Sequence, residues 1–164
     1  MIVVGIDVGL KTCGCVVCEM HGLDVQILRE DEVRTSASQT FAQKLDFIFE
    51  SLRTHVDHYR PHAIIVEKLY SHYRHPATLG ILAQVRGVVV LLAQRSGVEL
   101  FEYSPTRARK SFLGKGGAKS FQVKKMAENI CQRPFKSDHT ADAFSLVITF
   151  AHMQKVKNLE IAAQ

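Results

Sequence analysis

The sequence has no apolar run long enough to cross a membrane and no recognisable export signal. No run approaches the ~20 consecutive apolar residues that a membrane-spanning helix needs. The first residues lack the basic region and the small-residue cleavage site of a signal peptide. Internal repeats, low-complexity stretches and linkers are absent as well. We therefore expect a cytoplasmic protein without membrane association, folded as one domain over residues 1–155 and followed by a short tail, 156–164.

The cysteines show no C-x2-C pair of the kind that structural zinc sites use. Cys13, Cys15 and Cys18 fall within one predicted strand, whose alternation places the first two on one face and the third on the other. One zinc ion could hardly bind all of them. We expect these cysteines, and Cys131, to be reduced and mostly buried.

Acidic residues are missing between Glu102 and Glu128, although the chain as a whole has 16 of them against 21 lysines and arginines. The basic residues of this segment are Arg107, Arg109, Lys110, Lys115, Lys119, Lys124 and Lys125. A block of one charge sign predicts a surface for a polyanion such as nucleic acid. The alternative is a solvated helix face without a partner.

Apolar periodicity and turn residues predict an α/β domain. Three strands joined by short turns suggest an antiparallel meander, and a helix that ends by Arg60 and Pro61 leads to a fourth strand parallel to the first. Ser36 or Ser38 could cap that helix. The expected strands are 2–7, 12–19, 24–30, 62–67 and 98–103, and the expected helices are 41–60, 77–95, a short one after Pro105, 119–131 and 139–155. The result is a mixed five-stranded sheet flanked by helices.

Asp7 and Glu67 each close an apolar run that reads as a buried strand. Adjacent parallel strands would place the two carboxylates at the same edge of the sheet. His139 and Asp142, spaced i and i+3, would share one face at the start of the last helix. Three carboxylates and an imidazole suit Mg²⁺ or Mn²⁺. Two such ions ~4 Å apart could activate a water and stabilise the leaving oxygen of a phosphodiester.

Each of these residues also has a purely structural explanation. Asp7 could accept hydrogen bonds from turn amides, Glu67 could pair with Arg86, and Ser137 or Asp138 could be an ordinary helix cap. The segment that begins at Asp7 also resembles the first phosphate loop of the sugar kinase and actin ATPases. Those proteins need two copies of the domain, and no repeat is present here.

Several motifs, in order along the chain, resemble the RuvC family of Holliday-junction resolvases, which are crossover junction endodeoxyribonucleases. They are Gly5-Ile6-Asp7-Val8-Gly9, Val66-Glu67-Lys68-Leu69-Tyr70, Gln84-Val85-Arg86-Gly87, Glu102-Tyr103-Ser104-Pro105, Gly114-Lys115-Gly116-Gly117-Ala118 and His139-Thr140-Ala141-Asp142. The resemblance runs from about residue 1 to 152. It implies a ribonuclease-H-like fold and cleavage of four-way DNA junctions in recombination and repair.

The resemblance also implies roles for individual residues. Asp7, Glu67, His139 and Asp142 would be the catalytic, metal-binding set, whose third position is either aspartate or histidine in the family. The cofactor would be Mg²⁺, with Mn²⁺ as the alternative, and two ions per active site. Tyr70 matches an aromatic residue that contacts bases at the crossover. The expected DNA contacts are Tyr70, Tyr73, Arg74, Arg107, Arg109, Lys110, Lys115 and Lys119.

Implied partners are branched DNA, a second copy of the chain in a homodimer with helix 77–95 as the candidate surface, and branch-migration proteins. Two other functions compete. The opening motif also resembles the YqgF family, a ribonuclease-H-like group linked to RNA processing, which lacks the Glu102 to Pro105 motif and the glycine loop. A non-catalytic module that binds branched DNA is the other alternative. Such a module gains nothing from acids placed near phosphate without cations.

Overall fold

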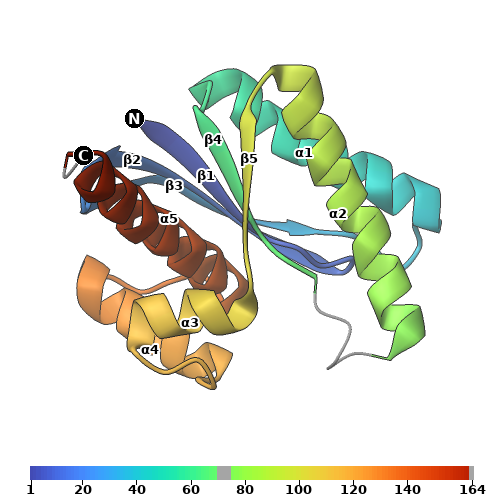
Figure 1. Ribbon diagram of the computed structural model, residues 1–164. Helices are drawn as coiled ribbons and strands as arrows, with labels where there is room; N and C mark the ends of the chain where they lie inside the picture. Colours follow the sequence, from blue (N-terminus) through green and yellow to red (C-terminus); the bar gives the residue numbers. More distant parts are fainter. Residues whose placement is uncertain (70–74, 163–164) are drawn as a thin grey trace.

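The computed structural model describes residues 1–69 and 75–162 (Figure 1). Its elements are β1 (Ile2–Asp7), β2 (Thr12–His21), β3 (Asp24–Arg34), α1 (Phe41–Tyr59), β4 (Ala63–Glu67), α2 (Pro76–Ser96), β5 (Glu99–Tyr103), α3 (Pro105–Leu113), α4 (Ser120–Cys131) and α5 (Asp138–Ala162). The sheet order is β3-β2-β1-β4-β5. β1, β2 and β3 pair antiparallel, whereas β4 pairs parallel with both β1 and β5. The predicted mixed five-stranded sheet is confirmed.

Helices cover both faces of the sheet. Figure 1 shows α1 and α2 on one face and α5, with α3 and α4 beside it, on the other. Because strand side chains alternate, β1 contributes Val3 to the α5 side and Val4 to the α1 side. The largest fully buried side chains include Phe144, Phe150, Ile48 and Leu52. Each is worth about 1.5–3 kcal/mol relative to an exposed position.

The first helix begins at Phe41 as predicted, but neither predicted serine is its cap. Thr40 is its N-cap, and Thr40 and Gln43 form a reciprocal capping box in which Thr40 Oγ1 accepts from the Gln43 amide at 3.3 Å. Ser36 and Ser38, the predicted caps, hydrogen-bond to each other instead. Gln43 explains why Thr40 is the cap, because each of these two side chains accepts a hydrogen bond from the backbone amide of the other residue.

Two glycines let α5 lie directly on the sheet. A Cβ atom on Gly5 would stand 2.3 Å from the Ala143 carbonyl oxygen, and one on Gly14 would stand 2.1 Å from the His139 carbonyl oxygen. Either substitution would therefore push the first turns of α5 away from β1 and β2. This close approach sets the distance between His139 and the strand ends.

The cysteine prediction is confirmed. Cys13, Cys15 and Cys18 are buried free thiols, with Cys18 on the α5 side of the sheet and the other two on the α1 side. Burial raises the pKa of Cys13 to about 11 and that of Cys15 to about 12. Such thiols are unreactive at neutral pH.

Three elements extend further than the sequence indicated. β2 reaches His21, β3 continues to Arg34, and residues 156–162, which we treated as a tail, prolong α5. By length and composition α2 could cross a membrane, although it contains no uninterrupted apolar run of that length. Of its most apolar 18-residue stretch, 28% is buried. One face of α2 packs on α1 and the sheet through Val85, Val89 and Leu92.

Candidate active site

The carboxyl ends of β1 and β4 and the start of α5 meet at one edge of the sheet, in the lower part of Figure 1. Asp7 is the last residue of β1 and Glu67 the last of β4. The two strands are parallel neighbours in which Ile6 pairs with Val66, so the two carboxylates leave adjacent strands at the same level. The predicted placement of Asp7 and Glu67 follows from this register.

Asp7 and His139 are in direct contact. The Nδ1 atom of His139 lies 2.7 Å from Oδ2 of Asp7, with 48% of the His139 side chain and 17% of the Asp7 side chain exposed. Because an ionised carboxylate only accepts hydrogen bonds, Nδ1 is assigned as the donor. The hydrogen bond to Asp7 raises the pKa of His139 above its usual 6.5, although partial burial opposes the shift.

Asp142 lies one turn further along α5, in an environment that disfavours its charge. Burial raises its pKa from the usual 3.8 to about 6, and the negative charge of Asp7 adds to the shift. A hydrogen bond from the Ser120 side chain and the positive charge of Arg109 oppose it. The groups that interact at this edge are therefore Asp7 of β1, Arg109 of α3, Ser120 of α4 and Asp142 of α5.

These residues do not form a complete cation cage. Within residues 1–69 and 75–162, no group of three or more histidine, cysteine, aspartate or glutamate side chains is placed to hold a metal ion. Asp7 and His139 are in contact, and Asp142 is close enough to Asp7 for the charge of Asp7 to raise the pKa of Asp142. Glu67 lies on the adjoining strand and lines a neighbouring cavity. The result is an edge at which four side chains of types able to ligate metals lie on adjoining elements.

The structural alternatives fare unevenly. Arg86, considered as a partner of Glu67, forms an ion pair with Glu102, in which Arg86 Nε lies 2.7 Å from Oε1. The Gly9 amide, considered as a donor to Asp7, points to Cys13 Sγ at 3.5 Å. Ser137 does precede α5, and its hydroxyl accepts from the Thr140 amide at 3.3 Å, as expected of a helix cap.

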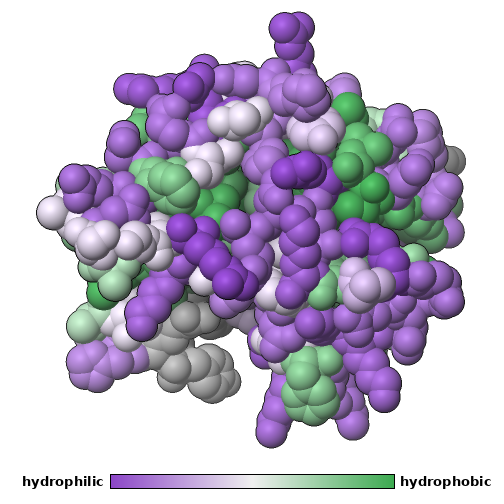
Figure 2. All heavy atoms as spheres, turned by 180° about the vertical axis from the view of Figure 1, so that it is seen from behind, coloured by the Kyte–Doolittle hydropathy of each residue, from purple (hydrophilic) through white to green (hydrophobic). Residues whose placement is uncertain are grey.

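A cavity of about 970 Å³ opens beside Glu67. Its lining combines apolar and basic side chains from the end of β4, from α3 and from the glycine loop: Leu69, Ser104, Pro105, Thr106, Arg107, Arg109, Lys110, Gly116 and Gly117. Lys115 and Lys119 are exposed in the segment between α3 and α4. Seen from behind in Figure 2, hydrophilic side chains cover most of the lobe that these two helices form.

The predicted DNA contacts therefore fall into three groups, of which the exposed Lys115 and Lys119 are one. Arg107, Arg109 and Lys110 are brought together along one wall of the cavity next to Glu67. Tyr70, Tyr73 and Arg74 lie outside the described residues. Ser120, by resemblance a position on the DNA-binding face, was not predicted to contact Asp142, because a hydroxyl at the start of a helix gives no signal beyond that of a cap.

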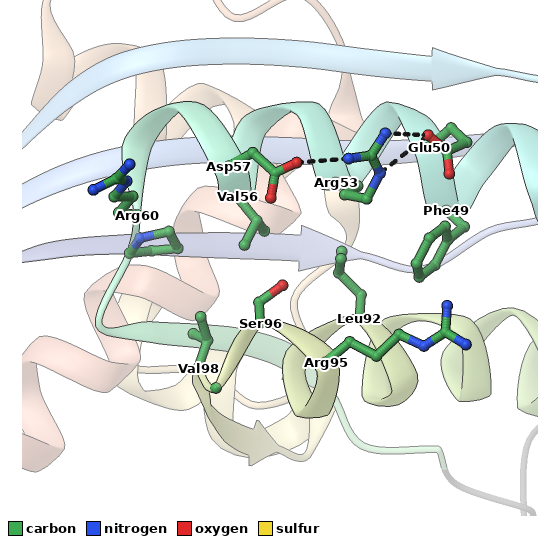
Figure 3. A pocket seen from close by; sticks show the side chains of 12 residues that line it. Phe49, Glu50, Arg53, Val56, Asp57, Arg60, Leu92, Arg95, Ser96 and Val98 are labelled. Carbon is green, nitrogen blue, oxygen red and sulfur yellow. Dashed lines mark hydrogen bonds and ion pairs between the residues drawn. The ribbon is translucent and has the colours of Figure 1, made fainter.

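A second groove lies at the opposite end of β4, between α1 and α2 (Figure 3). Its volume is about 710 Å³. Arg53 is neutralised there by Glu50 and Asp57, each at 2.7 Å, and the Arg95 guanidinium lies 5.9 Å from the centre of the Phe49 ring. None of the predicted metal-binding residues lines this groove, so it is not the candidate catalytic site.

Residues 3–150 match the family model described as Crossover junction endodeoxyribonuclease RuvC. The chain belongs to the RuvC family. A Heliobacterium modesticaldum protein of that description is 34% identical over 154 residues, which are 93% of this chain and 94% of the relative. The structure of Thermus thermophilus RuvC superposes with a TM-score of 0.84 and 25% identity, covering 96% of this chain and 97% of the other.

The same fold is found in Thermus thermophilus RuvC in complex with Holliday junction substrate, with a TM-score of 0.84, 23% identity, and 95% and 96% of the two chains covered. The fold is thus the ribonuclease-H-like fold of RuvC, as predicted. The family name describes a nuclease that hydrolyses phosphodiester bonds in DNA. The RNA-processing and non-catalytic alternatives are not favoured by these matches.

Proposed function

We propose that this RuvC-family protein resolves four-way DNA junctions, with Asp7, Glu67, His139 and Asp142 as its metal-binding catalytic set. The observation that carries the proposal is the pair formed by Asp7 and His139, with Asp142 close enough to be repelled by Asp7. A carboxylate whose pKa is raised by burial and by a neighbouring charge is a candidate functional residue. The basic wall beside Glu67 supplies the complementary attraction for DNA.

The chemistry of the four side chains fits Mg²⁺ or Mn²⁺. Carboxylate oxygens are the ligands of hard cations, and the mutual repulsion of Asp7 and Asp142 is what a cation would relieve. We infer two ions per site, which together polarise the attacking water and stabilise the leaving oxygen. His139 must be neutral to act as a ligand, so its hydrogen bond to Asp7 has to give way to coordination of both groups.

The cavity wall next to Glu67 would hold the DNA backbone. Arg107, Arg109 and Lys110 can each neutralise a phosphate, and Lys115 and Lys119 extend the basic surface toward α4. Binding should therefore weaken steeply with salt, because each neutralised phosphate releases condensed counterions. By resemblance, Tyr70 would stack on a base at the crossover, a contact worth about 1–3 kcal/mol, with Tyr73 and Arg74 beside it.

We further infer a homodimer formed through the exposed face of α2. Gly80, Ala83, Gly87, Leu91 and Gln94 are all exposed and recur at spacings of three and four, as along the seam of a coiled coil. Leu91 is 47% exposed. A Cβ atom on Gly80 or Gly87 would meet nothing within 4 Å.

Glycine inside a helix costs about 1 kcal/mol relative to alanine. Two glycines that the folded chain itself does not require are explained if another helix approaches there closely. A second copy of α2 is the proposed occupant, since two related active sites suit two strands related by symmetry across a junction. The apolar composition of α2 then reflects a protein interface.

A cleavage assay on matched substrates tests the function. A four-way junction, a replication fork, plain duplex and an RNA–DNA hybrid would be incubated with Mg²⁺, Mn²⁺ or Ca²⁺. We expect paired nicks in the junction with Mg²⁺ or Mn²⁺, and binding without cleavage in Ca²⁺. Preferential cleavage of the RNA-containing substrate would favour the YqgF-like alternative. Tight junction binding without cleavage in any metal would leave only a binding module.

A further inference from the structure

Glu30, on the edge strand β3, is a buried carboxylate outside the predicted site. It is 7% exposed. Its Oε2 atom accepts from Arg133 Nη1 at 2.7 Å. Its Oε1 atom accepts from the Lys136 backbone amide at 2.7 Å and from Thr140 Oγ1 at 2.6 Å. One side chain of β3 thus binds three groups of the segment that leads into α5.

The segment between α4 and α5 makes further contacts, and Phe135 within it is buried in the core. Arg133 also donates to the Pro134 carbonyl at 3.2 Å and its guanidinium lies 5.0 Å from the centre of the Phe135 ring. Lys136 Nζ contacts Asp31, the next residue of β3, at 3.1 Å. Charge-assisted hydrogen bonds in a buried site are stronger than neutral ones. Glu30 is therefore the main polar anchor of this segment to the sheet.

A β-bulge directs Glu30 to this position. Val17 pairs with Arg29 and Cys18 with Ile27, so Leu28 is an extra residue in β3. Ile27 packs on the α5 side of the sheet, and strict alternation would place Arg29 and Asp31 there too. The extra residue reverses the alternation, so that Glu30, opposite Val16, faces α5.

Thr140 connects this contact to the active site. It is fully buried and follows His139 directly, and two residues further on is Asp142. The His139 carbonyl oxygen meanwhile rests against Gly14 of β2. The first turn of α5 is thus fixed from β2 by close packing and from β3 by hydrogen bonds.

We propose that Glu30, acting through Thr140, is a positioning residue for the metal site, holding the start of α5 where His139 and Asp142 can share a cation with Asp7. The inference rests on the proposed function of that site. Hydrogen-bonding partners outside the ligand set commonly influence metal affinity or activity by about 10–100-fold. A carboxylate that merely stabilised the fold would not change the affinity of the folded protein for a cation.

Three variants and one control separate these two roles. Glu30→Gln keeps the shape of the side chain and removes its charge. Thr140→Val keeps the buried volume and removes the hydroxyl, whereas Thr140→Ser restores the hydroxyl and loses the methyl group. Val56→Ala, in the core on the other face of the sheet, supplies a destabilised protein with an unaltered site. Each is titrated with Mn²⁺ while its melting temperature is followed, and each is assayed for junction binding and single-turnover cleavage.

We expect Glu30→Gln and Thr140→Val to raise the Mn²⁺ concentration at half-maximal stabilisation by about tenfold or more. Cleavage at fixed Mn²⁺ falls in parallel, with junction affinity in Ca²⁺ within about twofold of wild type. Thr140→Ser restores the wild-type Mn²⁺ midpoint. Val56→Ala lowers the melting temperature and leaves the Mn²⁺ midpoint unchanged. The Thr140 pair decides the matter even if Glu30→Gln does not fold.

The proposal is overturned if Glu30→Gln and Thr140→Val both keep the wild-type Mn²⁺ midpoint while their melting temperatures fall as in Val56→Ala. Glu30 would then have only a structural role. The Mn²⁺ titration needs no substrate. A wild type that binds Mn²⁺ but cuts no junction would therefore refute the proposed function and still leave the positioning role to be judged by the shifted midpoints.

Discussion

Replacing Asp142 by asparagine should make the metal-free protein more stable while abolishing cleavage. Burial, aided by the charge of Asp7, raises the pKa of Asp142 from 3.8 to about 6. The folded chain then holds this proton more tightly than the unfolded chain, so stability falls as pH rises through that interval. About two pKa units at ~1.4 kcal/mol each set an upper limit near 3 kcal/mol. Partial solvent access should reduce the observable gain to about 1–2 kcal/mol.

Urea unfolding in EDTA at pH 4, 6 and 8 measures this gain. Asp142→Asn and wild type should differ little at pH 4, where the carboxyl is protonated in the folded state and still partly protonated in the unfolded state, and the variant should be the more stable one at pH 8. Adding Mg²⁺ should stabilise wild type more than the variant and shrink or reverse the difference. Asparagine keeps the shape of the side chain and an acceptor for Ser120, so packing is conserved.

Asp138→Asn is the matched control, because Asp138 is an exposed acid in the same first turn of α5. Its negative charge interacts favourably with the helix N-terminus, and its repulsion of Asp142 contributes least to the raised pKa of that residue, so its removal should give a much smaller gain than Asp142→Asn. If Asp142→Asn is less stable than wild type at pH 8 in EDTA, the ionised Asp142 carboxylate does not destabilise the metal-free protein and the prediction is wrong. It also fails if the gain is the same at pH 4 and pH 8, since a gain independent of pH would not come from the ionised carboxylate.

Asp7→Asn should abolish cleavage and keep junction binding in gel shifts with Ca²⁺. It should also lower the pKa of His139 in an NMR titration. Loss of junction binding would indicate a folding role for Asp7. Because the pKa of His139 is raised and a ligand must be neutral, cleavage should increase with pH through a midpoint above 6.5. His139→Asp should lack that midpoint, and an identical pH profile would exclude His139 as a ligand. Gly87→Leu should shift the protein to monomers in sedimentation, whereas Thr54→Leu on α1 should not; an intact dimer would refute the α2 interface.

The strand-end carboxylates were predictable because they depend on local pattern alone. A strand buried on both faces reads as an apolar run, and the acid that closes it must lie at an edge of the sheet. Placing Asp7 beside Glu67 needed only the parallel pairing of β1 and β4, which follows from the intervening helix. The direct bond between Asp7 and His139 joins residues 132 apart in sequence. It depends on Gly14 allowing α5 to approach β2, and no periodicity reports that contact.

The end of β3 was misjudged for a related reason. The strand was predicted to span 24–30, which left Asp31 and Glu32 outside it. In the structure the strand continues because Glu30 is buried against the segment before α5 and Asp31 pairs with Lys136. A single extra residue at Leu28 decides which of these acids faces α5. A bulge can thus turn an acidic run on an edge strand into the support of a neighbouring helix, so the charge pattern alone does not place these acids in solvent.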